Sequence, residues 1–242
     1  MHRRGPDILA PMLENIIGIL SHLSLPQLVI ISVLPVLFAI TVHEVAHGWI
    51  AQYLGDPTAQ RLGRVTLNPI KHIDPLGTIL VPAALLLIIA ITKSGFLFGW
   101  AKPVPVTWEN LRHPKRDMVI VAAAGPAANL LMAVLWGTLA KIATVLPPTI
   151  SVLSQPMFFM GLVGILINVL LMVFNLLPLP PLDGGRVAVG LLPNRAAWHL
   201  SRVEPFGFMI LLTLMITGFL WVIIGPPIRF SLRLVTTIVG LS

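Results

Sequence analysis

Residues 26–54 read PQLVIISVLPVLFAITVHEVAHGWIAQYL, an almost unbroken apolar run. A helix needs about 20 such residues to cross a bilayer, so this run is long enough to span one. It nevertheless contains three ionisable side chains, His43, Glu44 and His47. Ionisable groups are costly at membrane depth and mark function when they occur there. The run therefore predicts a membrane helix that carries a functional site.

The composition of the whole chain agrees with a membrane protein. Of its 242 residues, 56% are apolar and 10% are charged, against about 25% charged in ordinary soluble domains. This excludes a soluble globule and a disordered chain. The absence of cysteine excludes a disulfide scaffold, cysteine-based zinc fingers and thiol catalysis. We predict an all-α polytopic membrane protein with a single membrane-embedded domain over residues 1–242.

Further apolar runs predict about five to six transmembrane helices in total. Clear runs lie at 118–146, 157–177 and 206–225, and less certain ones at 8–22 and 76–92. No convincing signal peptide precedes them. Residues 226–242, with Arg229 and Arg233, are expected to form an interfacial amphipathic helix.

The distribution of charge predicts an orientation. Lys and Arg gather in the connections 55–75, 93–117 and 178–205, and are absent from 23–25 and 147–156. Basic connections stay in the cytoplasm, so the first three are assigned there and the other two outside. The net charge of +7 is then explained by topology, and no nucleic-acid partner is needed.

The connections 55–75 and 93–117 are both assigned to the cytoplasm, although only one apolar run lies between them. A single crossing would put them on opposite sides, so we predict a re-entrant segment around 76–106. The chain would enter the membrane and return over 76–98, with 93–106 coming back as an extended segment. Non-helical backbone at membrane depth is tolerated only where protein or a polar cavity surrounds it. The alternative is an ordinary span that breaks the charge rule.

The run HEVAH at 43–47 has the form H-E-x-x-H. Its spacing puts His43 and His47 on one face of a helix, where both can bind one metal ion, with Glu44 beside them as a general base. A catalytic zinc ion takes three protein ligands and keeps one position open. The alternative is a structural cluster whose polar groups only bond helices together.

Asp183 is the favoured third ligand. It ends the stretch NLLPLPPLD at 175–183, where three prolines break the helix and two glycines follow. The helix before it runs inward, so Asp183 arrives on the side of His43 and His47. Taken alone, the stretch could equally be a helix-ending turn. Six other His and acidic residues lie in polar connections and are expected to be mostly solvated: His72, Asp74, His113, Asp117, His199 and Glu204.

Together, H-E-x-x-H and N-L-L-P-x-P-P-L-D-G resemble the site-2 protease family of intramembrane zinc metalloproteases. Four further stretches agree with it: GDPTA at 55–59, GRVTLNP at 63–69, FGWAKPVPV at 98–106 and GPAAN at 125–129. The resemblance covers about residues 35–190. It implies a minimal form of the family, without PDZ or CBS domains, with a catalytic core at about 26–190.

The resemblance implies roles for individual residues. His43, His47 and Asp183 would hold one zinc ion per chain, and Glu44 would activate water. Asn175 and Asn129 would hold the substrate carbonyl or stabilise the oxyanion. The expected activity is hydrolysis of peptide bonds within or next to transmembrane segments. As a separate hypothesis from the β-forming residues and prolines around 96–106, Val104 and Val106 would pair with an unwound substrate strand.

The expected partners are a transmembrane protein substrate and the lipid bilayer. The expected location is a bacterial or archaeal-type cell membrane, with the site nearer its cytoplasmic face. Three alternatives stay open at this point. One is a zinc or proton transporter, which needs no general base at Glu44. Another is a different membrane metalloprotease with Glu204 as a ligand, and the last is an inactive adaptor.

Overall fold

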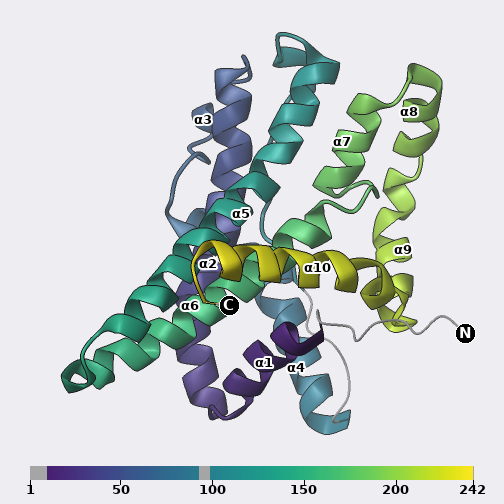
Figure 1. The fold of residues 1–242 in the computed structure, drawn as a ribbon. Coiled ribbons are helices and arrows are strands. Elements are labelled where there is room, and N and C mark those ends of the chain that lie inside the picture. The colour runs from purple at the N-terminus through teal and green to yellow at the C-terminus, as the bar shows by residue number, and fades with distance from the viewer. Residues whose placement is uncertain (1–9, 93–98, 242) are drawn as a thin grey trace, which may run out of the picture.

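The computed structural model describes residues 10–92 and 99–241 as a bundle of helices, with no β-strand among them (Figure 1). The fold class predicted from the sequence is confirmed. The longer helices are α1 (Ala10–Ser21), α2 (Leu25–Tyr53), α4 (Val81–Thr92), α5 (Pro114–Val145), α6 (Ser151–Asn175), α7 (Asp183–Leu191), α8 (Asn194–Ser201), α9 (Glu204–Ile216) and α10 (Phe219–Ile238). Shorter helical turns are α3 (Thr58–Arg61), η1 (Pro69–His72), η2 (Pro75–Leu80), η3 (Trp108–Asn110) and η4 (Pro148–Ile150).

Four of these helices are long and apolar enough to cross a membrane: α2, α5, α6 with the turn before it, and α10. A fifth span results if α8 and α9, which are bent by 63° relative to each other, cross as one. The total of four or five lies below or at the lower end of the predicted five to six, because α1 has only 12 residues and η2 with α4 is likewise too short to count as a span. Helix α1 corresponds to the predicted run 8–22, of which residues 8 and 9 lie outside the described residues. The protein is an integral membrane protein.

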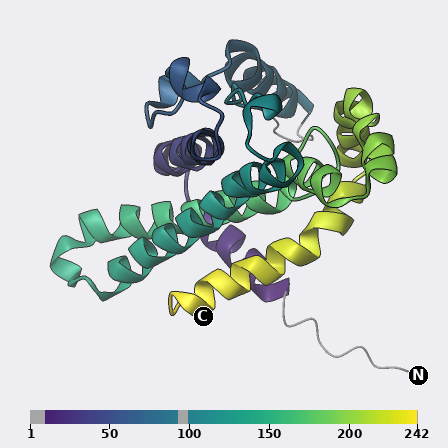
Figure 2. The ribbon, with the colours of Figure 1, turned by 90° about the horizontal axis from the view of Figure 1, so that it is seen from above.

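The centre of the molecule is the antiparallel pair α5 and α6, which projects to the lower left in Figure 1. Seen from above, α2 lies on one side of this pair and α10 on the other (Figure 2). Ile165 and Val169 of α6 are fully buried and belong to the same apolar core as Leu232 of α10. On its other side, the α5–α6 pair packs against α2, the helix that carries the H-E-x-x-H motif.

Glycines on α6 allow α5 to approach closely. A Cβ atom at Gly164 would lie 2.1 Å from Cγ of Trp136, and one at Gly161 would lie 2.6 Å from Cβ of Ala140. Small residues serve this purpose in membrane helices, where close packing replaces the hydrophobic effect as the source of association.

The chain doubles back within the predicted entering and returning segment. Helices η2 and α4 lead away from Gly77, and the chain is back beside it at Trp100. The Trp100 N–H donates to the Gly77 carbonyl at 3.0 Å, and the Trp100 carbonyl accepts from Thr78 Oγ1 at 2.8 Å. Residues 99–107, called the extended segment below, form neither helix nor strand, whereas 93–98 of the predicted extended segment lie outside the described residues.

The prediction of one span over 206–225 is wrong. Helix α9 ends at Ile216, and Gly218 takes a left-handed conformation (φ 74°) before α10 begins at Phe219. Glycine adopts this conformation without strain. The runs on both sides of it are mostly apolar, so the hydropathy of the sequence gives no sign of the break. Nor is 226–242 a separate helix, since α10 continues through Pro226 to Ile238.

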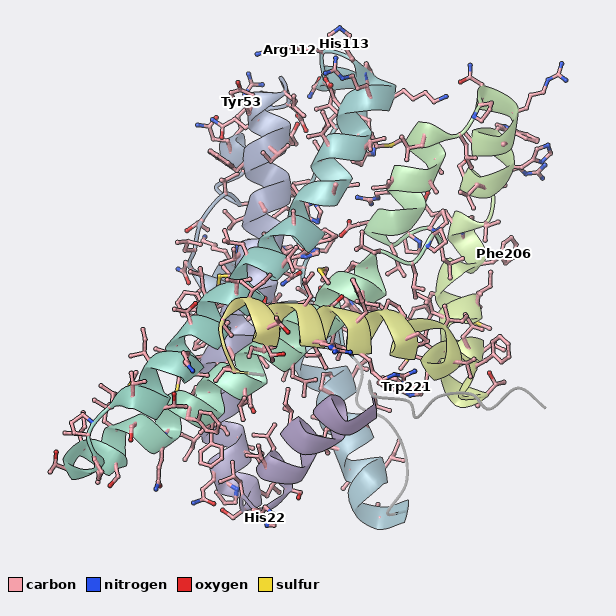
Figure 3. The ribbon with its side chains drawn as sticks, viewed as in Figure 1. His22, Tyr53, Arg112, His113, Phe206 and Trp221 are labelled. Atoms are coloured by element: carbon pink, nitrogen blue, oxygen red, sulfur yellow. The ribbon has the colours of Figure 1, made fainter. Side chains whose placement is uncertain are left out.

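The two ends of the bundle differ in the side chains that they carry. Tyr53, Arg112 and His113 lie at one end and His22 lies at the other (Figure 3). Helix α2 runs from the second end to the first.

The close approach of α5 and α6 predicts that Gly164→Ala destabilises the protein. The added methyl group would overlap Trp136, and overpacking of this kind costs about 1–3 kcal/mol. Thermal unfolding in detergent should show a lower Tm. The matched control is Gly18→Ala, where a Cβ atom meets nothing within 4 Å. Equal Tm values for the two variants would contradict the packing described here.

Candidate metal centre

Three potential ligands from two distant helices meet in a buried space. His43 and His47 stand on successive turns of α2, and their Nε2 atoms are 3.1 Å apart. Oδ2 of Asp183, the first residue of α7, lies 3.2 Å from Nε2 of His43 and 3.3 Å from Nε2 of His47. All three residues are buried, and they form a group that could hold a metal ion.

Second partners orient both imidazole rings. Nδ1 of His47 lies 2.7 Å from the Val121 carbonyl, and Nδ1 of His43 lies 2.6 Å from Oδ1 of Asn129. Both oxygens are acceptors, which assigns the ring protons to the Nδ1 atoms. The two Nε2 atoms therefore turn their lone pairs toward each other and toward Asp183.

The orientation of Asn129 is itself fixed. Its Nδ2 donates to the Ala39 carbonyl at 3.1 Å and to Oδ1 of Asn168 at 2.9 Å. Asn168 in turn donates to the Gly164 carbonyl at 2.9 Å. Both asparagines are completely buried. Asn129 thus uses both amide hydrogens inside the protein and offers His43 only its oxygen.

This arrangement fits a zinc ion. Two lone pairs and a carboxylate oxygen that face each other repel unless a cation lies between them, and Asp183 Oδ2 has no hydrogen-bond partner in the described part of the chain. Zinc bonds of about 2.0–2.2 Å in a tetrahedral site place neighbouring ligand atoms about 3.3–3.6 Å apart. The observed separations of 3.1–3.3 Å are close to this spacing.

Glycines bring Asp183 and α5 to the histidines. A Cβ atom at Gly184 would lie 2.2 Å from the Leu176 carbonyl oxygen, so only glycine lets the chain fold back here after α6. A Cβ atom at Gly125 of α5 would lie 2.4 Å from Nε2 of His47 and 2.6 Å from Nε2 of His43. Sequence reasoning assigned no role to Gly125.

Sequence reasoning also missed Asn168. The available signal was one amide side chain in the middle of the apolar run 157–177, since such a group needs a partner in the membrane. The partner, Asn129, lies on another helix, and no local pattern connects the two residues.

Glu44 faces the extended segment. Its Oε2 accepts a hydrogen bond of 2.7 Å from the N–H of Val104. Val104 is buried, and its side chain packs on Gly48 of α2. A Cβ atom added at Gly48 would lie only 2.9 Å from Cγ1 of Val104. The Val104 N–H is therefore already engaged, whereas Val106 packs against the buried cluster of Ala51, Leu111 and Val121.

A completely buried carboxylate anchors the far end of this segment. Asp56 accepts from the N–H of Thr107 at 2.7 Å, from Nδ2 of Asn110 at 3.0 Å and from the N–H of Thr58 at 3.0 Å. Burial alone would raise the pKa of Asp56, but these hydrogen bonds and one from the Thr58 hydroxyl outweigh it and lower the pKa. The ionised carboxylate thereby holds residues 107–110 against the end of α2.

Asn175 forms its hydrogen bond within its own helix. It is the last residue of α6, and its Nδ2 donates to the Leu171 carbonyl at 3.0 Å. This single bond leaves one amide hydrogen without a partner among the described residues.

The other six candidate ligands do not join the metal group in the part of the chain that the structure describes. The expectation that they are solvated is wrong for two of them. His72 is 2% exposed with its Nε2 bonded to the Thr66 carbonyl, and Asp117 is 3% exposed and accepts from the N–H of His113. Both serve local structure: His72 lies in η1, which packs against α2, and Asp117 lies in the first turn of α5, where it caps the start of the helix.

An apolar helical bundle with an H-E-x-x-H helix and a converging aspartate defines the class of membrane-embedded zinc metalloproteases. The family model described as Peptidase family M50 matches residues 139–218. "Putative zinc metalloprotease YwhC" of Bacillus subtilis (strain 168) is 38% identical over 190 residues, which cover 76% of this chain and 80% of the relative.

A second relative, "Putative zinc metalloprotease Rip2" of Mycolicibacterium smegmatis, is 33% identical over 181 residues, 75% of this chain and 64% of the relative. No solved structure matches significantly. The chain belongs to peptidase family M50, the site-2 protease family, and is a zinc metalloprotease. This membership favours the protease over a transporter or an inactive adaptor.

The hydrogen bond from His43 to Asn129 predicts that Asn129→Leu weakens zinc binding about 10–100-fold, the usual cost of losing such an orienting partner. Competition with a chelator measures the affinity. Asn175→Leu is the matched control, because Asn175 bonds only to its own helix, and its zinc affinity should stay unchanged. Equal affinities for both variants would contradict the role of Asn129.

Proposed function

We propose that this protein hydrolyses peptide bonds within or next to transmembrane segments of membrane-protein substrates. One zinc ion would be held by His43, His47 and Asp183, with Glu44 as the general base. The observation that carries the proposal is that Asp183 converges on His43 and His47 of α2. Helix α2 is long and apolar enough to span the membrane.

The depth of the centre supports a substrate in the bilayer. At about 1.5 Å per residue, His43 stands about 27 Å along α2 from Leu25, against a hydrocarbon core of about 30 Å. The scissile bond would therefore be reached near one face of the membrane. Because helical carbonyls are bonded within the helix, the substrate must unwind locally before it can be cleaved.

The chemistry that a bound zinc ion supplies is Lewis-acid polarisation of water and of the scissile carbonyl. Glu44 takes the proton from the attacking water and passes it to the leaving amine. The N–H of Val104 holds one carboxylate oxygen of Glu44 and so limits the directions in which the other can point. Asn129, through His43, keeps the ligand set in register.

The extended segment is suited to hold an unwound substrate. The Val106 N–H and carbonyl form no hydrogen bond within the described residues, so they are available to a partner strand. Val104 can join such a pairing through its carbonyl, since its N–H is engaged by Glu44. Asn175 has one amide hydrogen available for a substrate carbonyl or the oxyanion.

We assign the catalytic core to about 26–190 within a single domain and place the site nearer the cytoplasmic face of a bacterial or archaeal-type membrane. The support is the charge rule applied to the connections at the end of the bundle that carries Arg112 and His113 (Figure 3). The ligands lie in the half of α2 that leads to that end.

Glu44→Gln tests the reaction. Loss of a general base costs about 10²–10⁴-fold, so cleavage of a model transmembrane substrate should fall at least about 100-fold while zinc content stays near one per chain. The matched control, Glu109→Gln at an exposed position, should cleave normally. Cleavage that survives in Glu44→Gln would overturn the proposal.

The orientation has its own test, because the chain has no cysteine. His22→Cys and His113→Cys place single thiols at exposed positions at opposite ends of the bundle. With a membrane-impermeant maleimide on intact cells, the first variant should react and the second should react only after permeabilisation. The reverse pattern would place the site on the other side.

A further inference from the structure

A buried arginine lies close to the extended segment. Arg64 is 9% exposed, and its Nη2 donates to the Lys102 carbonyl at 2.8 Å and to the Pro103 carbonyl at 3.4 Å. Its Nε is buried without a partner, and no carboxylate in the described part of the chain forms an ion pair with it. A buried cation without a carboxylate partner is costly, so its position calls for an explanation.

The explanation lies in a single peptide group. The Pro103 carbonyl and the Val104 N–H belong to the same peptide unit. The carbonyl faces Arg64, and the N–H donates to Oε2 of Glu44 at 2.7 Å. The peptide dipole is therefore aligned between a cation and a carboxylate. Hydrogen bonds in such a chain polarise one another, most strongly where water is excluded.

The rest of the segment leaves this peptide little freedom. Pro103 and Pro105 restrict the backbone on both sides of Val104. The N–H of Lys102 donates to the His72 carbonyl at 2.9 Å, and Asp56 holds Thr107 further along. Arg64 is the charged side chain that binds the two carbonyls preceding Val104, those of Lys102 and Pro103.

We infer that Arg64 is a positioning residue for Glu44: it fixes the Pro103–Val104 peptide so that the Val104 N–H holds the carboxylate of the general base. The inference rests on the proposed role of Glu44. Within the described residues the side chain of Arg64 hydrogen-bonds only residues 102 and 103 of the extended segment, so its effect on the reaction passes through that segment.

The test compares Arg64→Gln and Arg64→Lys with Arg61→Gln, a neighbouring exposed arginine. Misplacement of a catalytic group by about 1 Å can cost about 100-fold. We therefore expect Arg64→Gln to lower kcat about 10–100-fold, with KM within about two-fold and zinc content unchanged. Arg64→Lys keeps the charge and should lose only about two- to five-fold. Arg61→Gln should match the wild type.

A second measurement does not depend on activity. Val104 has the one backbone amide hydrogen between Pro103 and Pro105, so its hydrogen exchange reports the bond to Glu44. Exchange should be slow in the wild type and in Arg61→Gln, and faster in Arg64→Gln. If Arg64→Gln does not fold, Arg64→Lys decides, with a reduced kcat and faster Val104 exchange expected.

The outcomes separate this inference from the proposed function. If Glu44→Gln abolishes cleavage but the Arg64 variants keep the wild-type kcat and Val104 exchange, the inference about Arg64 is overturned and the protease reaction stands. A loss confined to KM or to zinc content would also overturn it, because that is the result of a purely structural role. Cleavage by Glu44→Gln would overturn the proposed function itself.

Discussion

Two imidazole nitrogens and one carboxylate oxygen meet at a buried site, where a bound cation would relieve their mutual repulsion. Much of the molecule serves to bring these atoms together. Helix α2 supplies the histidines at a spacing of one turn, and the break after α6 delivers Asp183. Gly125 lets α5 come close enough for its Asn129 to hold the ring of His43. Five of the buried polar residues, His43, His47, Asn129, Asn168 and Asp183, belong to this arrangement.

The features that depend on local spacing were predictable from the sequence. Run length and hydropathy predict α2, α5 and α6, since a membrane imposes a minimum length on its helices. H-E-x-x-H predicts two ligands on one face, and the prolines and glycines around Asp183 predict a break there. The charge asymmetry predicts an entering and returning segment, and the bond from Trp100 to Gly77 brings residues 77 and 100 of this segment side by side.

The features that depend on non-local contacts were not predictable. The turn at Gly218 is a backbone conformation that hydropathy does not record. His72 and Asp117 are polar and were expected in solvated connections, yet both are buried. His72 lies in η1, which packs against α2, and Asp117 lies in the first turn of α5, where it caps the start of the helix. The bond between Asn129 and Asn168 joins residues that are 39 positions apart. Only the packing of α5 against α6 shows that each satisfies the other.

The two halves of the metal centre lie on opposite sides of most of the described chain: His47 comes before α5 and α6, and Asp183 comes after them. An ion bound to both would close a long loop, and a closed loop has far fewer unfolded conformations than an open chain. A ligand that binds the folded form alone also shifts the unfolding equilibrium by mass action. The same ion would thus act as a removable cross-link, so the group that takes part in catalysis would also stabilise the folded helical bundle.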